Sequence, residues 1–479
     1  AAQFGMQIGM MVPLSAYYFF RWPVAGAYAN LIAIPLVGIV LQLSMLAGLL
    51  GLIPGIGIYL ALLLSAANWV FSTAFLLIGH YFSRWFLYPF VSKPTIRFLF
   101  IYYAAVAIFA YWRPLWFRLL RPRWQKASTS LRIVFSALVA LVLVGVVLSQ
   151  RDEQKTLRTE GTLDVTVLSV GYGSAIFVDT PDNRAILIDT AFIQTDKGRR
   201  NDTERTVLPH IYARHITQLE ALVLTSREPE YSSGVHSVLQ YIDTKNFFYP
   251  ASAASLLEKE PLAALLAERS PARLKHRLSG TTIAPKALVA GDVIYQSTVD
   301  GKPFLIEAVG PTPNDTQAPL SVRISYGTFS MLIPSDLTLQ QQQNLLANTP
   351  PEKLKATVAL APHHGTAGLE TITLGIPDDM DQRLATITGS LMKTIQPDAV
   401  IFDFGNPRPV VGLKYKEAVK LHGATRRAIE DALPNALNVA TDTDGAIYIT
   451  SDGSTYTFTT QLSATGSETD EPSLLEIGW

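Results

Sequence analysis

The side chains in this sequence that are best suited to chemistry are two adjacent histidines and a few carboxylates. His363 and His364 precede Gly365 after an apolar run, and Asp189 and Asp336 each stand at the end of such a run. Imidazole and carboxylate groups both bind divalent metals. Taken alone, however, a His-His-Gly turn is more often a helix cap or a partner for the backbone. Asp336 precedes an expected helix, so it is also a candidate N-cap.

Charged residues between 199 and 230 could form part of the same site. Glu228 and Glu230 flank Pro229, which allows either a pair of metal ligands or a solvated acidic turn. Several arginines are candidates for DNA phosphate contacts or else scattered surface charges: Arg199, Arg200, Arg205, Arg214 and Arg227. The chain has no cysteine, no Gly-x-Ser-x-Gly elbow and no P-loop. Thiolate chemistry is therefore excluded, and no nucleotide-binding motif supports ATP hydrolysis.

Apolar spacing after residue 160 predicts the elements that would position these groups. Strands are predicted at 162–169, 175–180, 185–189, 221–225, 304–309, 321–326, 328–333, 357–361 and 399–402. Helices are predicted at 203–215, 234–242, 251–268, 337–347, 381–394 and 413–432. Short antiparallel strands come first and strand–helix alternation follows, which indicates a layered α/β domain with helices on both faces.

The composition changes sharply near residue 150. Residues 1–150 contain ten basic residues and no Asp or Glu, and the first acidic residue is Asp152. Of the 39 lysines and arginines, 29 therefore lie in the remainder together with all 39 acidic residues, which gives that part a formal charge of −10. The neutral total is an average over a membrane half and a soluble half.

Five apolar stretches in the first half approach the length of a membrane-spanning helix, about 20 residues. They lie at about 5–20, 25–53, 56–80, 97–112 and 132–149. The stretch 25–53 contains Asn30, Pro35 and Gln42, so we expect a broken or re-entrant segment there. The loop 113–132 carries six basic residues and no acid, which the positive-inside rule places in the cytoplasm. Everything after Gln150 would then lie on the other side, unless the loop is only a basic surface patch.

The order of several short motifs resembles the ComEC/Rec2 family of competence proteins, which join a competence-type membrane domain to a metallo-β-lactamase-like domain. SVGYGSA at 169–175 is similar to the family's Asp-Val-Gly-Gln-Gly-Asp-Ala, and LIDTA at 187–191 to Leu-Ile-Asp-Gly-Gly. PHHGT at 362–366 is similar to Pro-His-His-Gly-Ser, and Ser335-Asp336 to the family's Gly-Asp pair. AAQFG at 1–5 and ANLIAIP at 29–35 resemble segments of the membrane domain.

The resemblance also shows where this chain departs from the family. A working member has His-x-Asp-x-Asp-His where this chain reads SREPEY at 226–231, so Ser226 and Tyr231 replace two metal-ligand histidines. A phenol at 231 would occlude the pocket. The implied residual site is rich in oxygen and suits Mn²⁺ or Mg²⁺ better than Zn²⁺, if it binds any metal. Its members are Asp189, Glu228, Glu230, Asp336, His363 and His364, with Asp336 and His363 as vestigial catalytic residues.

The resemblance implies an organisation and a function for the whole chain. We expect about five spans of a partial membrane domain at 1–150, a linker at 151–160, an αββα metallo-β-lactamase-like domain at 161–461 and a flexible tail at 462–479. Because the chain begins at Ala1 inside an apolar segment, we expect it to be part of a longer protein.

The expected function is passage of single-stranded DNA across the bacterial cytoplasmic membrane, with other DNA-uptake proteins as partners. The soluble domain would lie on the extracytoplasmic side and be non-catalytic. The alternatives are an active Mn²⁺-dependent nuclease on the same channel, or a membrane-anchored scaffold or sensor unrelated to DNA.

Overall fold

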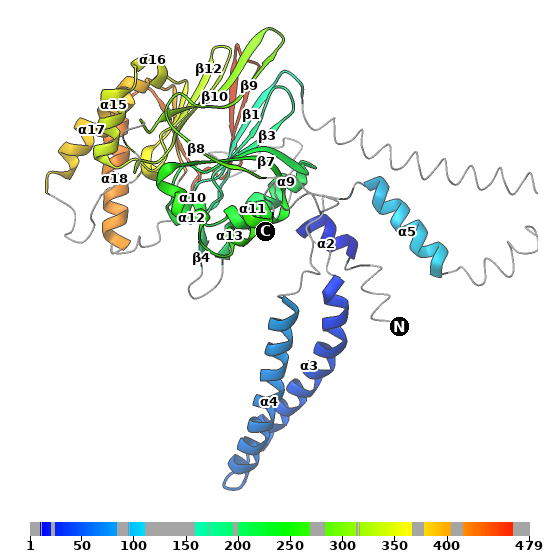
Figure 1. Cartoon of the computed structure of the whole chain (residues 1–479). Helices are drawn as coiled ribbons and strands as arrows, with labels where there is room; N and C mark the ends of the chain where they lie inside the picture. The colour runs from blue at the N-terminus through cyan, green and yellow to red at the C-terminus, as the bar shows by residue number, and fades with distance from the viewer. Residues whose placement is uncertain are drawn as a thin grey trace, which may run out of the picture. The chain divides into compact units, whose positions relative to one another are not determined.

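The computed structural model divides the chain into two compact units, which are described separately (Figure 1). One comprises Ala1–Lys155 with Ile477–Trp479, and the other Thr156–Glu476. The expected linker at 151–160 and tail at 462–479 lie almost entirely outside the residues that the structure describes. Those residues are 10, 12–20, 24–83, 94, 96–110, 159–171, 173–194, 200–268, 283–312, 315, 317–365, 378–403 and 415–462.

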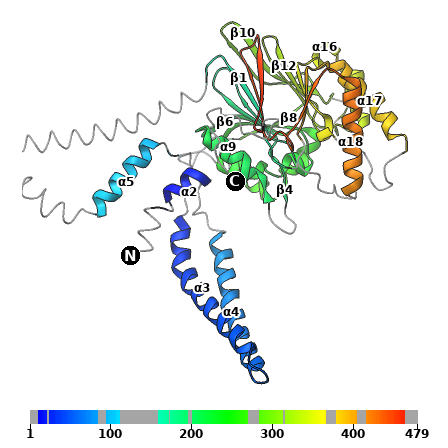
Figure 2. The same ribbon diagram turned by 180° about the vertical axis from the view of Figure 1, so that it is seen from behind.

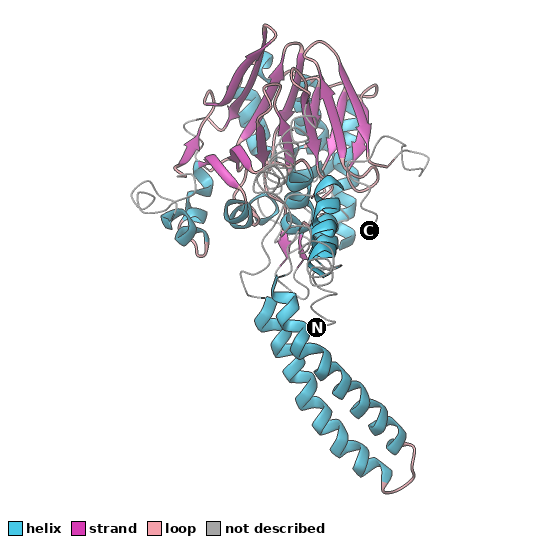
Figure 3. Cartoon of the chain, turned by 90° about the vertical axis from the view of Figure 1, so that its right-hand side faces the viewer, coloured by secondary structure: helices cyan, strands magenta, loops and turns pink. Residues whose placement is uncertain are grey.

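Four helices make up most of the described part of the first unit. They are α2 (Val12–Phe19), α3 (Val24–Gly51), α4 (Gly57–Ser83) and α5 (Ile96–Ala110). α3 and α4 pack against each other as a helical hairpin (Figure 3). Within the hairpin, Asn68 Nδ2 donates a 2.8 Å hydrogen bond to Ser44 Oγ. Such a bond between apolar helices helps to fix their register where water is scarce.

Two of these helices are long and apolar enough to cross a membrane. Their apolar segments are Tyr28–Gly51, with a mean hydropathy of 2.2, and Gly57–Gly79, with 1.9, and almost none of their side chains are buried. They correspond to the spans expected at 25–53 and 56–80 and indicate membrane association. The stretch expected at 97–112 overlaps α5, whereas the span at 132–149 and the basic loop at 113–132 lie outside the described residues.

The expected break within 25–53 is wrong, because α3 continues through Pro35. Proline removes one backbone hydrogen bond, but an apolar helix tolerates that loss when adjacent turns and neighbouring groups compensate for it.

Two sheets form the centre of the second unit. The first has the strand order β17-β16-β1-β2-β3-β6-β7-β8 and the second β15-β14-β13-β12-β11-β10-β9. The strands of the first sheet are β1 (Leu163–Val167), β2 (Ile176–Asp179), β3 (Ala185–Ile188), β6 (Gln218–Val223), β7 (Asp243–Pro250), β8 (Pro285–Leu288), β16 (Ile447–Ser451) and β17 (Tyr456–Thr460). Those of the second are β9 (Val293–Val299), β10 (Lys302–Gly310), β11 (Ser321–Tyr326), β12 (Phe329–Ile333), β13 (Val358–Leu360), β14 (Ala399–Phe402) and β15 (Leu437–Ala440). A separate ribbon pairs β4 (Ile193–Gln194) with β5 (Arg200–Asn201).

Helices surround these sheets. They are η3 (Thr203–Val207), α9 (Leu208–Ala213), α10 (Pro229–Ser232), α11 (Val235–Tyr241), η4 (Ala251–Ala253), α12 (Ala254–Leu257), α13 (Leu262–Glu268), α15 (Leu339–Asn348), α16 (Pro351–Leu354), η5 (Pro362–Gly365), α17 (Met380–Ile395) and α18 (Tyr415–Ala432). Figures 1 and 2 show α15–α18 together on one side of this unit and α9–α13 on another.

The alternation of side chains along each strand explains the layers. Ile186 of the first sheet and Met331 and Val358 of the second meet in a core between the sheets. Leu332 and Ala359 point the other way and lie in a cluster with residues of α15–α18. α11 contacts β7 on the first sheet. The result is the predicted αββα sandwich, so the fold class is confirmed.

Two sequence-based expectations for this unit need correction. The helix expected at 251–268 is divided into η4, α12 and α13, because Pro261 disfavours a helical conformation at the preceding residue. The expectation that Asp336 is an N-cap is also wrong. Thr338 caps α15, accepting a hydrogen bond from the Gln341 amide while the Gln341 side chain bonds back to the Thr338 amide.

Candidate functional site

The predicted site residues lie in loops that follow parallel strands. β3 and β6 are parallel neighbours in the first sheet, and β12, β13 and β14 are parallel neighbours in the second. Parallel strands end at the same edge of a sheet, so the loops that follow them meet there. The polar side chains of these loops form one buried or half-buried group, called the polar cluster below: Asp189, Thr225, Ser226, Ser335, Asp336, His363, His364 and Asp403.

Asp189 is fully buried at the end of β3 and is held by Thr225. One carboxylate oxygen accepts a 2.7 Å bond from the Thr225 amide, and the other accepts a 2.7 Å bond from the Thr225 hydroxyl. That hydroxyl also lies 2.6 Å from Ser335 Oγ, which follows a strand of the other sheet. Burial raises the pKa of Asp189 to about 8. Thr225 therefore links Asp189 in the first sheet to Ser335 at the end of a strand of the second.

Asp336 forms the second connection between the sheets. Its Oδ2 accepts a 3.0 Å hydrogen bond from Ser226 Oγ, and its Oδ1 lies 3.0 Å from His363 Nε2. Ser226 is thus the direct partner of this carboxylate. Both oxygens of Asp336 and the Nε2 of His363 are engaged by protein groups.

His364 is buried beside Asp403, with Nδ1 3.1 Å from a carboxylate oxygen of that residue. Burial alone would lower the pKa of His364. The carboxylates of Asp403, Asp336 and Glu230 together outweigh this effect and raise the pKa to about 9. The imidazole is therefore cationic at neutral pH and is stabilised by surrounding carboxylates.

Tyr231 covers this imidazole. Its ring stacks on His364 with the centroids 4.7 Å apart and the planes 21° from parallel, and the residue is only 3% exposed. Burial raises the pKa of the phenol well above its usual value of 10, so it stays protonated. The Thr190 hydroxyl and amide both bond to the Tyr231 carbonyl, which fixes α10 over the polar cluster.

The two glutamates of the acidic turn, Glu228 and Glu230, have surroundings different from those of the carboxylates in the polar cluster. Glu228 is exposed and pairs with Arg227 at 3.4 Å, with the side chains 49% and 53% exposed. Glu230 is half-buried, and burial raises its pKa. Glu228 therefore matches the interpretation as a solvated acidic turn, whereas the negative charge of Glu230 helps to raise the pKa of His364.

Several residues around the polar cluster have left-handed backbone angles that side chains rarely adopt. They have φ values between 50° and 65° and are Asp189, Ala191, Ser335, His363 and His364. The His363 amide donates to the Ser335 carbonyl at 2.9 Å, so two of these strained turns support each other. The loops are therefore held by specific hydrogen bonds.

The donors of the polar cluster do not fit a metal centre. Within the described part of the chain, no group of three or more His, Asp or Glu side chains is arranged to hold an ion. Both oxygens of Asp189 accept from Thr225, and Asp336 and His363 engage each other. The two-metal chemistry of a working family member would need donors that converge on an open coordination position.

The DNA-contact candidates fall in different places. Arg227 is exposed, Arg199 lies outside the described residues, and Arg200 belongs to β5. Arg214 pairs with the buried Asp179 and lies over the Phe177 ring, so it is a structural residue.

Sequence reasoning missed four members of this region. Thr225, like Asp189, is the last residue of a predicted strand, and Ser335 and Asp403, like Asp336, follow one, so strand ends were the signal that could have found them. His422, on α18, bonds to the Gly365 carbonyl at 2.9 Å. Nothing in its spacing indicated that contact.

The geometry defines a class of protein: apolar helices able to enter a membrane, joined to an αββα domain with a polar cluster at its loop edge. Residues 1–116 match the Competence protein family. A curated relative, ComE operon protein 3 of Bacillus subtilis (strain 168), is 24% identical over 221 residues. That match covers 44% of this chain and 26% of the relative, so it spans about a quarter of the relative's length. Together these findings support a ComEC/Rec2 family protein, as the motifs predicted.

Solved structures similar to this chain include metallo-β-lactamase proteins. DIM-1 metallo-β-lactamase exposed to ceftazidime is 16% identical, with a TM-score of 0.24 and coverage of 57% of this chain and 94% of that chain. Rubredoxin oxygen:oxidoreductase from Desulfovibrio gigas is 10% identical, with a TM-score of 0.26 and coverage of 57% of this chain and 60% of that chain. A metallo-β-lactamase from Hirschia baltica is 11% identical, with a TM-score of 0.23 and coverage of 56% and 94%.

Proposed function

We propose that this chain is a membrane component of a DNA-uptake system and passes single-stranded DNA across the bacterial cytoplasmic membrane. The αββα domain is a non-catalytic part of that system and lies on the extracytoplasmic side. The Competence family match and the ComE relative support the competence role. The apolar α3 and α4 support the association with lipid.

The observation that carries the non-catalytic assignment is the stack of Tyr231 on His364. A neutral, buried phenol stands at a position where the family has a histidine, and it closes the space in front of the second imidazole. Ser226 bonds to Asp336 at the other replaced position. A hydrolase of this class needs a metal-bound water with access to substrate, and these two contacts argue against such a water at this position.

Metal analysis and a cleavage assay test this assignment on the full chain purified in detergent. Elemental analysis after dialysis should find no stoichiometric Mn, Mg or Zn, and labelled single-stranded DNA should stay intact with added Mn²⁺. Asp336→Ala is the informative variant, and Asp381→Ala, at an exposed position on α17, is its matched control. Cleavage that Asp336→Ala abolishes and Asp381→Ala retains would establish a nuclease and overturn the proposal.

A second experiment separates DNA uptake from a scaffold or sensor role. Loss of the gene should abolish natural transformation in a competent host, and complementation should restore it. Unchanged transformation would contradict the DNA-uptake function. A reporter fused after residue 160 tests the sidedness, because an export-dependent reporter should be active there and a cytoplasmic signal would reverse the placement.

A further inference from the structure

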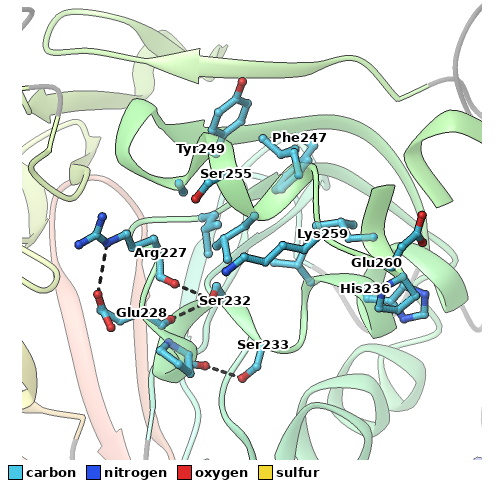
Figure 4. A pocket seen from close by; sticks show the side chains of 18 residues that line it. Arg227, Glu228, Ser232, Ser233, His236, Phe247, Tyr249, Ser255, Lys259 and Glu260 are labelled. Carbon is cyan, nitrogen blue, oxygen red and sulfur yellow. Dashed lines mark hydrogen bonds and ion pairs between the residues drawn. The ribbon is translucent and has the colours of Figure 1, made fainter. Parts of the chain in front are cut away.

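A cleft of about 530 Å³ lies beside α10, apart from the polar cluster. Residues of α10, α11, β7, α12 and α13 line it (Figure 4). Pro229 and Ser232 of α10 border the cleft, whereas Tyr231 of the same helix stacks on His364. The helix therefore separates two environments, and the cleft is a distinct site. Its volume is within the roughly 300–1,000 Å³ typical of small-molecule sites.

The floor of the cleft is apolar and its edge carries polar groups. Buried residues form the floor: Leu224, Val235, Phe247 and Leu262. Tyr249 is half-buried and packs near Phe247, with the ring centroids 6.1 Å apart. Hydroxyl, ammonium and guanidinium groups of Ser255, Lys259 and Arg227 lie at the edge. An apolar floor with donors at one edge suits a ligand that is both aromatic and anionic.

The charges around the cleft favour an anion near Lys259. Lys259 is exposed, and in Figure 4 its side chain extends across the cleft while the Glu260 carboxylate lies at the far end. Glu228 is already paired with Arg227, and an exposed pair of this kind is weak, so the guanidinium can also bind a phosphate. Burial lowers the pKa of His236, which keeps its imidazole neutral at pH 7. The lining thus carries two cations, Arg227 and Lys259, and two carboxylates, of which Glu228 pairs with Arg227 and Glu260 lies away from the Lys259 ammonium.

We propose that this cleft binds one nucleotide of single-stranded DNA. The base lies on the apolar floor beside Tyr249, and the phosphate contacts Lys259 and Arg227. This inference rests on the proposed function, because it assigns a DNA subsite to a domain that we propose handles DNA without cutting it. Base–aromatic stacking together with basic groups on the backbone is how proteins bind single strands without sequence preference.

The test uses the full chain in a non-ionic detergent and fluorescence anisotropy with two labelled probes. One probe is an oligo-dT, and the other has the same number of phosphates but abasic spacers. Affinity is measured from low to moderate salt for the wild type, Lys259→Ala and Tyr249→Ala. Lys393→Ala, at another exposed lysine on α17 that does not line the cleft, is the matched control.

The phosphate contact and the base contact give different results. Lys259→Ala should reduce the slope of log K against log salt by about 0.7, the value for one phosphate contact on a single strand, and Lys393→Ala should leave it unchanged. Tyr249→Ala should weaken oligo-dT binding about tenfold, as loss of one stacked base does, and affect the abasic probe little. A slope that Lys259→Ala and Lys393→Ala change equally would overturn the assignment of the cleft, as would equal losses on the two probes.

The same data separate failure of the cleft from failure of the proposed function. If the wild-type chain binds neither probe, the DNA-handling function itself fails. If it binds both and the cleft variants behave like the control, DNA contacts another surface and only the cleft assignment is wrong. Lys259 is exposed, so Lys259→Ala leaves the core intact, and the dependence of its DNA affinity on salt can be measured on a folded protein.

Discussion

Replacement of Tyr231 by alanine removes the ring that lies against His364 and leaves the backbone of α10 in place. The side chain is 3% exposed, and its ring centroid is 4.7 Å from that of His364. No small neighbour can fill the volume of a tyrosine ring without movement of the strand-end loops. We therefore expect a large loss of stability in the second unit.

The size of this loss follows from burial. Truncation of a large buried aromatic residue to alanine lowers the free energy of unfolding by about 3–5 kcal/mol. The stacked contact contributes about 0.5–1.5 kcal/mol of that amount. Tyr231→Phe keeps both the ring and the stack, so its loss should stay below about 1.5 kcal/mol. Tyr241→Ala on α11, where the side chain is 36% exposed, should lower stability by only about 1 kcal/mol.

Pulse proteolysis in urea, with the full chain in detergent, measures these differences by following the fragment that contains the αββα domain. The predicted order of stability is wild type, then Tyr231→Phe, then Tyr231→Ala. A loss below about 1 kcal/mol for Tyr231→Ala, or equal losses at 231 and 241, would refute the packing argument. It would also remove the main support for an occluded site.

Three further predictions concern the same domain. The double variant Ser226→His and Tyr231→His returns two imidazoles beside Asp336, so the zinc content found by elemental analysis should rise from substoichiometric to about one ion per chain. No gain in zinc would mean that the loops, and not these two residues, prevent binding. Thr225→Val removes a buried hydroxyl that bonds to Asp189 and should lower the free energy of unfolding by about 1–3 kcal/mol in urea titrations, whereas Thr225→Ser should lose far less. Burial holds the pKa of His210 well below 6.5, so only the unfolded chain binds this proton near pH 6.5. The stability from the neutral imidazole is present above that pH and lost as pH falls, and His210→Leu should flatten a stability profile measured from pH 7 to 5.

Residues at strand ends could be predicted because strands give a clear sequence signal. The strands predicted at 185–189, 328–333 and 357–361 ended within one residue of the observed ends of β3, β12 and β13. The same rule would have included Asp403 after β14. The partners of these residues could not be predicted, because Thr225 meets Ser335 only after two sheets have packed.

Other elements were missed because their local patterns are weak. β9 lies at the edge of its sheet, and most of its residues are half-buried or exposed, so its apolar alternation is incomplete. A broken or re-entrant segment was expected within 25–53, but α3 continues through Pro35 because a long apolar helix tolerates one missing hydrogen bond. The cleft beside α10 also gave no sequence signal, since its lining comes from short stretches of helix, strand and loop spread over residues 224–262.

The polar links between the two sheets have a consequence for the order of folding. Thr225 and Ser335 are 110 residues apart in the chain, as are Ser226 and Asp336. Contacts of such long range must first close a long loop, so we expect them to form late in assembly. Interactions that form late slow unfolding more than they speed folding. We therefore expect these two hydrogen bonds between the sheets to slow the unfolding of the sandwich while leaving its folding rate little changed.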